Sequence, residues 1–334
     1  MSRRILESFA RPFLIDTHEI FISASVGISI YPSDGETAEV LLKNADTAMY
    51  HAKEQGRSNC QFYSTGLNAA ASERLDVEND LRKAVERREF LIYYQAKVDV
   101  RSRRITGAEA LIRWRHLRRG ILSPAHFLPA AIDTGLIRPM DEWMLREACL
   151  QSRRWQAAGL APITVSVNVS NSLFHGSTLV PTASKALSES GLASQYLELE
   201  LTESIAMRDM DTSITMLEDL KRMGIRLSID DFGTGYSSLS YLQRLPLSRL
   251  KIDQSFVRNL GTDEHNERII RAIIALAHSF ALPVLAEGVE TEEQFRKLEE
   301  EGCDEVQGYL FSRPTNAEEF ERLLRRDADS RRVA

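Results

Sequence analysis

Cysteine is scarce in this sequence, which holds three such residues among 334. Cys60, Cys149 and Cys303 lie far apart, and no CxxC pair is present. A zinc ribbon or a disulfide framework is therefore not expected. The spacing indicates three free thiols in a reducing compartment, so we expect a cytoplasmic protein.

Long apolar runs and a surplus of basic residues are absent as well. No run of about 18 apolar residues occurs, so no membrane span is expected in this fragment. Lys and Arg number 42 against 48 Asp and Glu, a net charge of −6, which argues against a nucleic-acid polymer as partner. Residues 1–6 resemble the interior of a helix. We therefore expect a longer parent protein, in which an upstream part can carry a membrane tether.

The chain divides into three predicted segments: 1–64, 65–88 and 89–328. In the first, strands are expected at 12–15, 20–30 and 59–63, with a turn at Asp16–Glu19 and a helix at 37–55. Segment 65–88 is charged and contains no proline, so we expect a connecting helix.

The third segment alternates short apolar strands with amphipathic helices, which is typical of a TIM-like (β/α)8 barrel. Strands are expected at 90–100, 107–114, 163–169, 197–201, 225–230, 249–253, 283–287 and 304–307. Helices are expected at 139–158, 210–223, 264–280 and 291–301, among others. A doubly wound open sheet is the alternative, but no glycine-rich phosphate turn follows the first strand.

Polar residues lie within these apolar strands or at their carboxyl ends. They are Glu109, Asn168, Glu200, Glu203, Asp230, Asp231, Lys251, Asp253, Glu287 and Gln307. In a barrel the carboxyl ends of the strands meet at one mouth, where active sites lie.

Several carboxylates in one pocket would repel one another unless a cation neutralised them. The oxygen-rich set, which lacks His and Cys, favours Mg²⁺ or Mn²⁺ over zinc. Asp230 and Asp231 are adjacent, so they can reach two ions, the apparatus of phosphodiester hydrolysis. Any single one of these residues is more often a surface carboxylate or a turn residue, and the recurrence on strand after strand weakens that interpretation. Asp231-Phe232-Gly233 by itself suggests a protein kinase, but a glycine-rich nucleotide loop and His-Arg-Asp are missing.

Six motifs in order resemble the EAL family of cyclic di-GMP phosphodiesterases over about residues 75–325. They are Glu109-Ala110-Leu111 with Arg113-Trp114, Ser166–Ser170, Glu200–Glu203, Asp230–Leu239, Leu250–Asp253 with Ala286–Glu290, and Gln307–Tyr309. The resemblance implies a barrel whose first strand runs antiparallel to the others. The chain departs from the family at Ala96 and Leu117, where proline is common, and neither position is a ligand.

The resemblance also implies roles for individual residues. The implied metal ligands are Glu109, Asn168, Glu200, Asp230, Asp231 and Glu287, for two Mg²⁺ or Mn²⁺ ions per site. Glu287 matches both a metal ligand and a general base, and the two roles stay open. Lys251, Glu203 and Asp253 match catalytic positions, Glu203 as a brace of the loop after Asp231. Gln95, Arg113, Glu290 and Gln307 match substrate-binding or activity-linked positions.

The first segment resembles the C-terminal half of a GGDEF diguanylate cyclase domain. The matching stretches are Ala24–Ile28, Tyr31–Gly35, Asn44–Lys53 and Gly56-Arg57. The signature loop that binds metal and nucleotide is absent, so this segment by itself is not expected to be a cyclase.

The resemblance therefore implies hydrolysis of cyclic di-GMP to linear 5′-pGpG. The alternatives are a cyclic di-GMP receptor that does not cut its ligand and a module that acts through surface contacts. Every metal-ligand position is filled, which favours the enzyme. Ca²⁺ is expected to inhibit, and a homodimer through the barrel is expected near the loop Asp231–Ser238.

Overall fold

The structure is a computed structural model. It describes residues 2–9, 13–15, 18–20, 22–54, 58–175, 178–207, 210–234, 242–261 and 263–333. Contacts between Cα atoms divide the chain into two compact units, Met1–Arg82 and Lys83–Ala334. The boundary lies within helix α3 (Thr65–Arg87).

The first unit is a small α/β segment. Its elements before α3 are α1 (Ser2–Ser8), β1 (Phe13–Ile15), β2 (His18–Ile20), β3 (Val26–Ile28), α2 (Ala38–Glu54) and β4 (Cys60–Phe62). Strands β1 and β2 pair antiparallel, and β3 and β4 pair parallel. Helix α2 packs so closely on β3 that a Cβ at Gly27 would lie 1.9 Å from the Ala45 carbonyl oxygen.

The strands predicted at 12–15 and 59–63 and the helix predicted at 37–55 correspond to β1, β4 and α2. The single strand predicted at 20–30 is wrong: Ile20 ends β2, residues 22–25 are not in a strand, and β3 covers only Val26–Ile28. The turn predicted at residues 16–19 is shorter than expected, because His18 and Glu19 already belong to β2. Asp16 and Thr17 lie outside the described residues, as do Gly56 and Arg57.

The second unit is built on a closed barrel. Its strands are β5 (Phe90–Asp99), β6 (Ile105–His116), β8 (Thr164–Asn168), β9 (Leu197–Thr202), β10 (Arg226–Phe232), β11 (Arg249–Ile252), β12 (Val284–Ala286) and β13 (Glu305–Gln307). They pair in the order β5-β13-β12-β11-β10-β9-β8-β6, and a β5–β6 pairing closes the ring. Strand β5 is antiparallel to both of its neighbours, while β6 and β8 to β13 pair parallel. The predicted TIM-like barrel with one antiparallel strand is confirmed.

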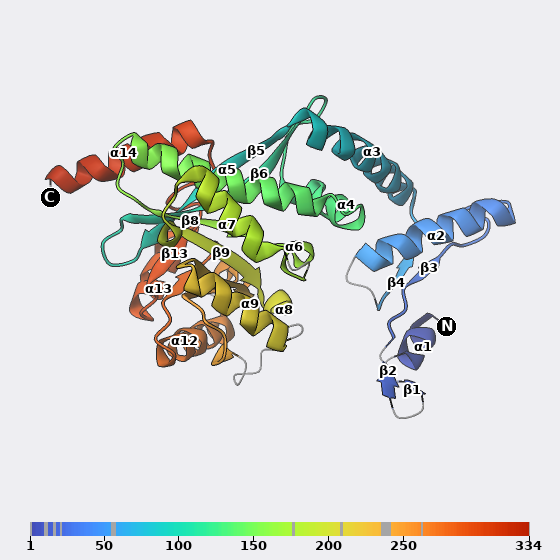
Figure 1. Cartoon of the computed structure of the whole chain (residues 1–334). Helices are drawn as coiled ribbons and strands as arrows, with labels where there is room; N and C mark the ends of the chain where they lie inside the picture. Colours follow the sequence, from blue (N-terminus) through green and yellow to red (C-terminus); the bar gives the residue numbers. More distant parts are fainter. Residues whose placement is uncertain are drawn as a thin grey trace. The chain divides into compact units, whose positions relative to one another are not determined.

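Helices surround the barrel (Figure 1). They are α4 (Leu128–Asp133), α5 (Ile137–Ala157), α6 (Asn171–His175), α7 (Leu179–Ser190), α8 (Glu203–Ala206), α9 (Met210–Arg222), α11 (Gln254–Arg258), α12 (Glu264–Ser279), α13 (Glu292–Glu300) and α14 (Ala317–Val333). Short 3-10 turns occur at Pro124–His126 and Ser194–Tyr196, and strand β7 (Gly120–Leu122) pairs with β6 outside the ring. None of the described helices combines the length and the apolar character that crossing a membrane requires.

Local sequence explains the position of several helices. Asp263 caps α12 by accepting a hydrogen bond from the His265 backbone N–H, and Thr291 with Gln294 forms a capping box at α13.

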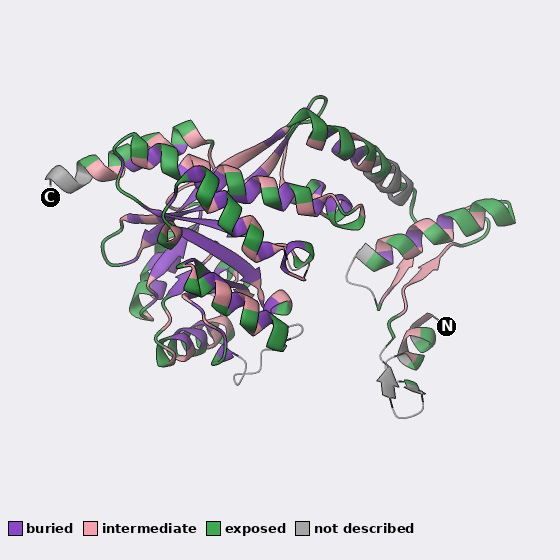
Figure 2. Ribbon diagram, viewed as in Figure 1, coloured by how far each residue is buried: buried purple, intermediate pink, exposed green. Residues whose placement is uncertain are grey.

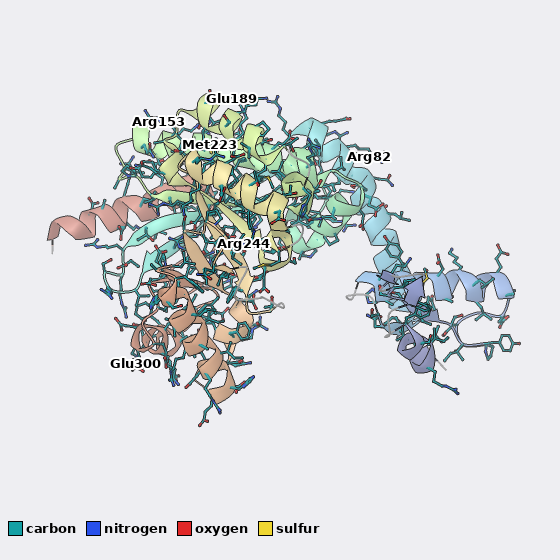
Figure 3. The ribbon with its side chains drawn as sticks, turned by 60° about the horizontal axis from the view of Figure 1, so that its bottom comes forward. Arg82, Arg153, Glu189, Met223, Arg244 and Glu300 are labelled. Carbon is teal, nitrogen blue, oxygen red and sulfur yellow. The ribbon has the colours of Figure 1, made fainter. Side chains whose placement is uncertain are left out.

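Charged side chains such as Arg153, Glu189 and Glu300 are exposed and lie on the outer helices (Figure 3).

The barrel strands are buried on both faces, in contrast to the helices with their exposed outer sides (Figure 2). In β9, Leu197, Leu199 and Leu201 alternate with Glu198 and Glu200, and all five are buried. Because side chains alternate across a strand, the two glutamates share the face that lines the barrel interior. Charged side chains therefore fill part of the barrel interior, and the candidate functional site is in contact with them.

Candidate functional site

The chemistry-bearing side chains come from the carboxyl ends of the parallel strands, except for Glu109, which lies inside β6. Their positions are Glu109 in β6, Asn168 in β8, Glu200 in β9, Asp230 and Asp231 in β10, Lys251 in β11, Glu287 after β12, and Gln307 in β13. Gln95 joins them from the antiparallel strand β5, where it pairs directly opposite Glu109. The barrel geometry thus gathers polar groups from all eight strands of the ring at one mouth.

Lys251 lies at the centre of this group and is fully buried. Its Nζ is 2.6 Å from Glu200 Oε2, 2.9 Å from Asp230 Oδ1 and 2.5 Å from Glu287 Oε1. Burial by itself would lower the pKa of Lys251. The surrounding carboxylates, with Glu109 among them, outweigh burial and hold this pKa well above its usual range, so the ammonium stays charged.

A β-bulge places two consecutive carboxylates in the mouth. Between Ile229 and Phe232, β10 has one residue more than the facing stretch of β11. Asp231 has a positive φ of 54°, which is uncommon for a residue with a side chain. The bulge interrupts the two-residue alternation of the strand, so Asp230 and Asp231 both contribute to the site.

Asp230, Asp231 and Glu287 form a group that fits a divalent cation. One carboxylate oxygen from each lies within 4.8 Å of those of the other two. Asp231 also shares a side-chain hydrogen bond with Asp253. The set is made of oxygens alone, which suits Mg²⁺ or Mn²⁺.

The crowding of acids shifts the pKa values of the carboxyl groups in the site. Burial and the Asp230 charge raise the pKa of Asp231 to about 6. Burial raises the pKa of Glu109, and it raises that of Glu287 well above the usual range, with neighbouring carboxylates adding to both shifts and Lys251 opposing them. Like charges in a dry pocket favour the protonated forms. A bound cation would relieve that repulsion, so the residues present fit the metal that the sequence predicts.

Amide side chains connect the remaining members of the group. Asn168 Nδ2 donates to Glu109 Oε1 at 2.7 Å. Gln307 Nε2 donates to Glu109 Oε2 and to Gln95 Oε1, the latter at 3.1 Å. Within the described part of the chain, the buried Gln307 Oε1 has no hydrogen-bond partner. Gly308 permits this arrangement, because a Cβ there would lie 2.0 Å from the Val289 carbonyl oxygen.

Two further predicted residues support the β10 end. The buried Glu203 accepts a hydrogen bond at 3.3 Å through Oε2 from the backbone N–H of Gly233. Asp253 caps α11, since its Oδ1 accepts from the Ser255 backbone N–H at 3.0 Å. Residues 235–238 of the predicted loop Asp231–Ser238 lie outside the described residues.

Arg113 and Glu290 form their hydrogen bonds outside the carboxylate group, although the Glu109 charge acts on Arg113. The Arg113 guanidinium is 5.4 Å from the centre of the Tyr93 ring, and its Nη1 donates to the Ile112 carbonyl oxygen. Partial burial lowers the pKa of Arg113. Glu290 is exposed, and its backbone N–H donates to Gln294 Oε1.

Four interior charges were not singled out from the sequence: Lys97, Glu198, Arg249 and Glu305. Lys97 Nζ lies 2.6 Å from Glu200 Oε1 and 3.2 Å from Glu198 Oε2, so the site rests directly on this second layer. The sequence spacing could have identified two of them. Glu198 and Arg249 lie two residues before Glu200 and Lys251, and therefore on the same face of their strands.

Comparison with known proteins identifies the family of each part of the chain. Residues 78–314 match the family model of the EAL domain, and residues 1–59 match that of the diguanylate cyclase GGDEF domain. The solved structure of the PaMucR phosphodiesterase in complex with c-di-GMP is 46% identical and superposes with a TM-score of 0.72. It covers 73% of this chain, and this chain covers 99% of it.

Two curated relatives come from Pseudomonas aeruginosa. The bifunctional diguanylate cyclase/cyclic di-GMP phosphodiesterase MucR is 46% identical over 96% of this chain and 47% of its own length. The cyclic di-GMP phosphodiesterase NbdA is 43% identical over 98% of this chain and 42% of its own length. The chain thus spans a little under half the length of these relatives. With most of its barrel unit covered by the family match and the expected residues at the barrel mouth, the chain belongs to the EAL domain family, and its first unit is part of a GGDEF domain.

Proposed function

We propose that this chain hydrolyses cyclic di-GMP to linear 5′-pGpG. The observation that supports it most is the complete set of oxygen donors around a buried lysine at one barrel mouth. Relatives of similar sequence are named cyclic di-GMP phosphodiesterases. A receptor that had lost hydrolysis would not need to keep every one of these groups.

The metal ligands in this proposal are the predicted ones. They are Glu109, Asn168, Glu200, Asp230, Asp231 and Glu287, for two Mg²⁺ or Mn²⁺ ions, and Ca²⁺ would inhibit. When bound, such ions lower the pKa of a water molecule and offset the charge of the phosphodiester.

The chain's own residues supply the remaining electrostatics. In the hydrolysis, a water oxygen bonds to phosphorus and the bond from phosphorus to the ribose 3′-oxygen breaks. The charged Lys251 Nζ would stabilise negative charge that develops on the phosphoryl oxygens. Glu287, 2.5 Å from Lys251 Nζ, is placed either to hold a cation or to take the proton from water. The 3′-oxygen then takes up a proton to leave as a hydroxyl group.

Substrate recognition is assigned to the groups around the carboxylates. The Arg113 guanidinium would pair with a phosphate oxygen while it rests on Tyr93. Gln95 and Gln307 offer amide atoms for a guanine edge, and the unpartnered Oε1 of Gln307 is an acceptor for an N–H donor. The exposed Glu290 is proposed as a further substrate-binding residue. Glu203 would hold the β10 end through its hydrogen bond with the Gly233 backbone N–H, and Asp253 through the side-chain hydrogen bond that it shares with Asp231.

The test is direct. The purified chain is incubated with cyclic di-GMP and Mg²⁺, and the products are separated by chromatography. Linear 5′-pGpG is expected from the wild type and from Glu292→Gln, a matched change on the exposed surface, and not from Glu109→Gln. Saturable binding of cyclic di-GMP without product in either Mg²⁺ or Mn²⁺ would refute the hydrolase and favour the receptor.

Two broader features belong to the same proposal. The chain is proposed to act in the reducing cytoplasm, which agrees with Cys60, Cys149 and Cys303 all being free. It is proposed to form a two-fold homodimer through the barrel, with the segment Asp231–Ser238 near the contact. Light-scattering mass tests the dimer, and residues 235–238 of that segment lie outside the described structure.

A further inference from the structure

A row of alternating charges runs down the barrel interior from the site. We call it the interior ion-pair chain, and its members are Lys251, Glu200, Lys97, Glu198, Arg249 and Glu305. All six are less than a tenth exposed. Arg249 Nη1 lies 2.8 Å from Glu198 Oε2, and Arg249 Nη2 pairs with Glu305. Three cations face three anions, so the row is neutral as a whole.

Within this row, the two oxygens of Glu200 have different partners. Oε1 accepts from Lys97 Nζ at 2.6 Å, and Oε2 accepts from Lys251 Nζ at 2.6 Å. Lys251 also contacts Asp230 and Glu287, which belong to the cation-binding group, whereas Lys97 contacts Glu198 in the layer below. One oxygen of Glu200 is therefore turned toward the site and the other away from it.

A gain in folding stability does not by itself explain this buried row of ion pairs. Taking a lysine and a glutamate out of water is costly, and replacing a buried ion pair by apolar residues of similar volume is often neutral or stabilising. Lys97 is 1% exposed, so water does not compete for Glu200 Oε1. A fixed orientation of the carboxylate is an effect that an apolar residue at position 97 would not reproduce.

We propose that Lys97 is a positioning residue that restricts Glu200 to a single oxygen toward the cation-binding group. The proposal rests on the proposed function in taking Glu200 as a metal ligand. Mg²⁺ requires six oxygens in near-ideal octahedral geometry, while Ca²⁺ accepts six to eight, often with both oxygens of one carboxylate. By holding Oε1, Lys97 favours Mg²⁺ over Ca²⁺ at this site.

Two double variants separate positioning from general electrostatics. The first, K97M/E198Q, removes Lys97 from Glu200 Oε1 and leaves Arg249 a neutral acceptor at position 198. The second, R249M/E305Q, removes the lowest ion pair and leaves Lys97 on Glu200. Each loses one positive and one negative charge, so both keep the net charge of −6.

The measurement is calorimetric titration of the full chain with Mg²⁺ alone and with Ca²⁺ alone, without nucleotide, after circular dichroism has established folding. Residues that orient a metal ligand typically change metal affinity by about 10–100-fold. The ratio of Mg²⁺ affinity to Ca²⁺ affinity is expected to fall at least about tenfold in K97M/E198Q and to stay at the wild-type value in R249M/E305Q.

An unchanged ratio in K97M/E198Q would overturn the positioning role, and so would an equal fall in both variants. If K97M/E198Q does not fold, the apolar pair K97L/E198L provides the same comparison. Wild-type protein that binds neither cation would overturn this proposal together with the metal-dependent function. A shifted ratio in a chain that leaves cyclic di-GMP intact would support the role of Lys97 and refute the hydrolase only.

Discussion

The buried carboxyl group of Asp141 is expected to make the barrel less stable as the pH rises. This carboxyl lies on α5 and is 9% exposed, and it accepts side-chain and backbone hydrogen bonds from Ser170, two residues after Asn168. Within the described residues its Oδ2 has no hydrogen-bond partner. Burial, opposed by the Ser170 hydrogen bonds and reinforced by the Glu142 charge, raises the pKa of Asp141 from 3.8 to about 6.

The direction in which the free energy of unfolding changes with pH follows from proton linkage. Between pH 3.8 and about 6 the folded state binds more protons than the unfolded state, so the free energy of unfolding falls as the pH rises. The full difference corresponds to about 3 kcal/mol, of which about 1.3 kcal/mol falls between pH 5 and pH 7. Asp141→Asn keeps the volume and one acceptor oxygen but does not ionise. Relative to the wild type, this variant should gain about 1.3 kcal/mol between these pH values.

Urea denaturation of both proteins at pH 5, 6 and 7 measures this gain. Tryptophan fluorescence is a suitable signal, because Trp114, Trp143 and Trp155 all lie in the barrel unit. Trp155→Phe offers a control, since it changes a buried residue of the same helix without altering any ionisable group. Wild-type and Asp141→Asn stabilities that change in parallel with pH would refute the assigned pKa and its cause.

Four further outcomes are expected. Hydrolysis should require Mg²⁺ or Mn²⁺ and stop with chelator, while Ca²⁺ should support little turnover; full activity in metal-free buffer would contradict this. Glu109→Ala and Asp230→Ala should each reduce turnover by at least roughly 100-fold, and Arg113→Ala should mainly raise KM, as steady-state kinetics will measure. Gly308→Ala should lower the thermal midpoint and weaken nucleotide binding, because its Cβ would meet the Val289 carbonyl oxygen. Specific activity should rise with protein concentration alongside the dimer mass, and a fully active monomer would exclude that coupling.

The strand pattern was readable from sequence because each barrel strand is a short apolar run that ends in a polar residue. The eight predicted strands correspond to β5, β6 and β8 to β13 within a few residues. Helix α7, which carries Pro181 in its first turn, and α14 at the charged C-terminal end were not among the helices named from the sequence. Most of the stability of a surface helix comes from its packing on the rest of the fold, which is not a local property of the sequence.

The positions of the candidate ligands were likewise readable, but their mutual geometry was not. Lys97 and Glu198 are a hundred residues apart, and their contact depends on the register in which distant strands close the ring. The bulge at Asp231 depends on how β10 pairs with β11. Local sequence names the residue types at the mouth, and only strand pairing decides which atoms meet.

The bulge in β10 has a consequence for how homologous sequences should be compared. In a regular strand, two consecutive aspartates point to opposite sides, one into the barrel and one toward the helices. The Asp-Asp pair therefore has chemical meaning here because of the extra residue and the positive φ at Asp231. A homologue that kept both aspartates but lost one residue of β10 directly beside them would lose the bulge and bring only one of them to the mouth. Insertions and deletions in this short stretch are thus a better guide to lost activity than the identity of the two acids.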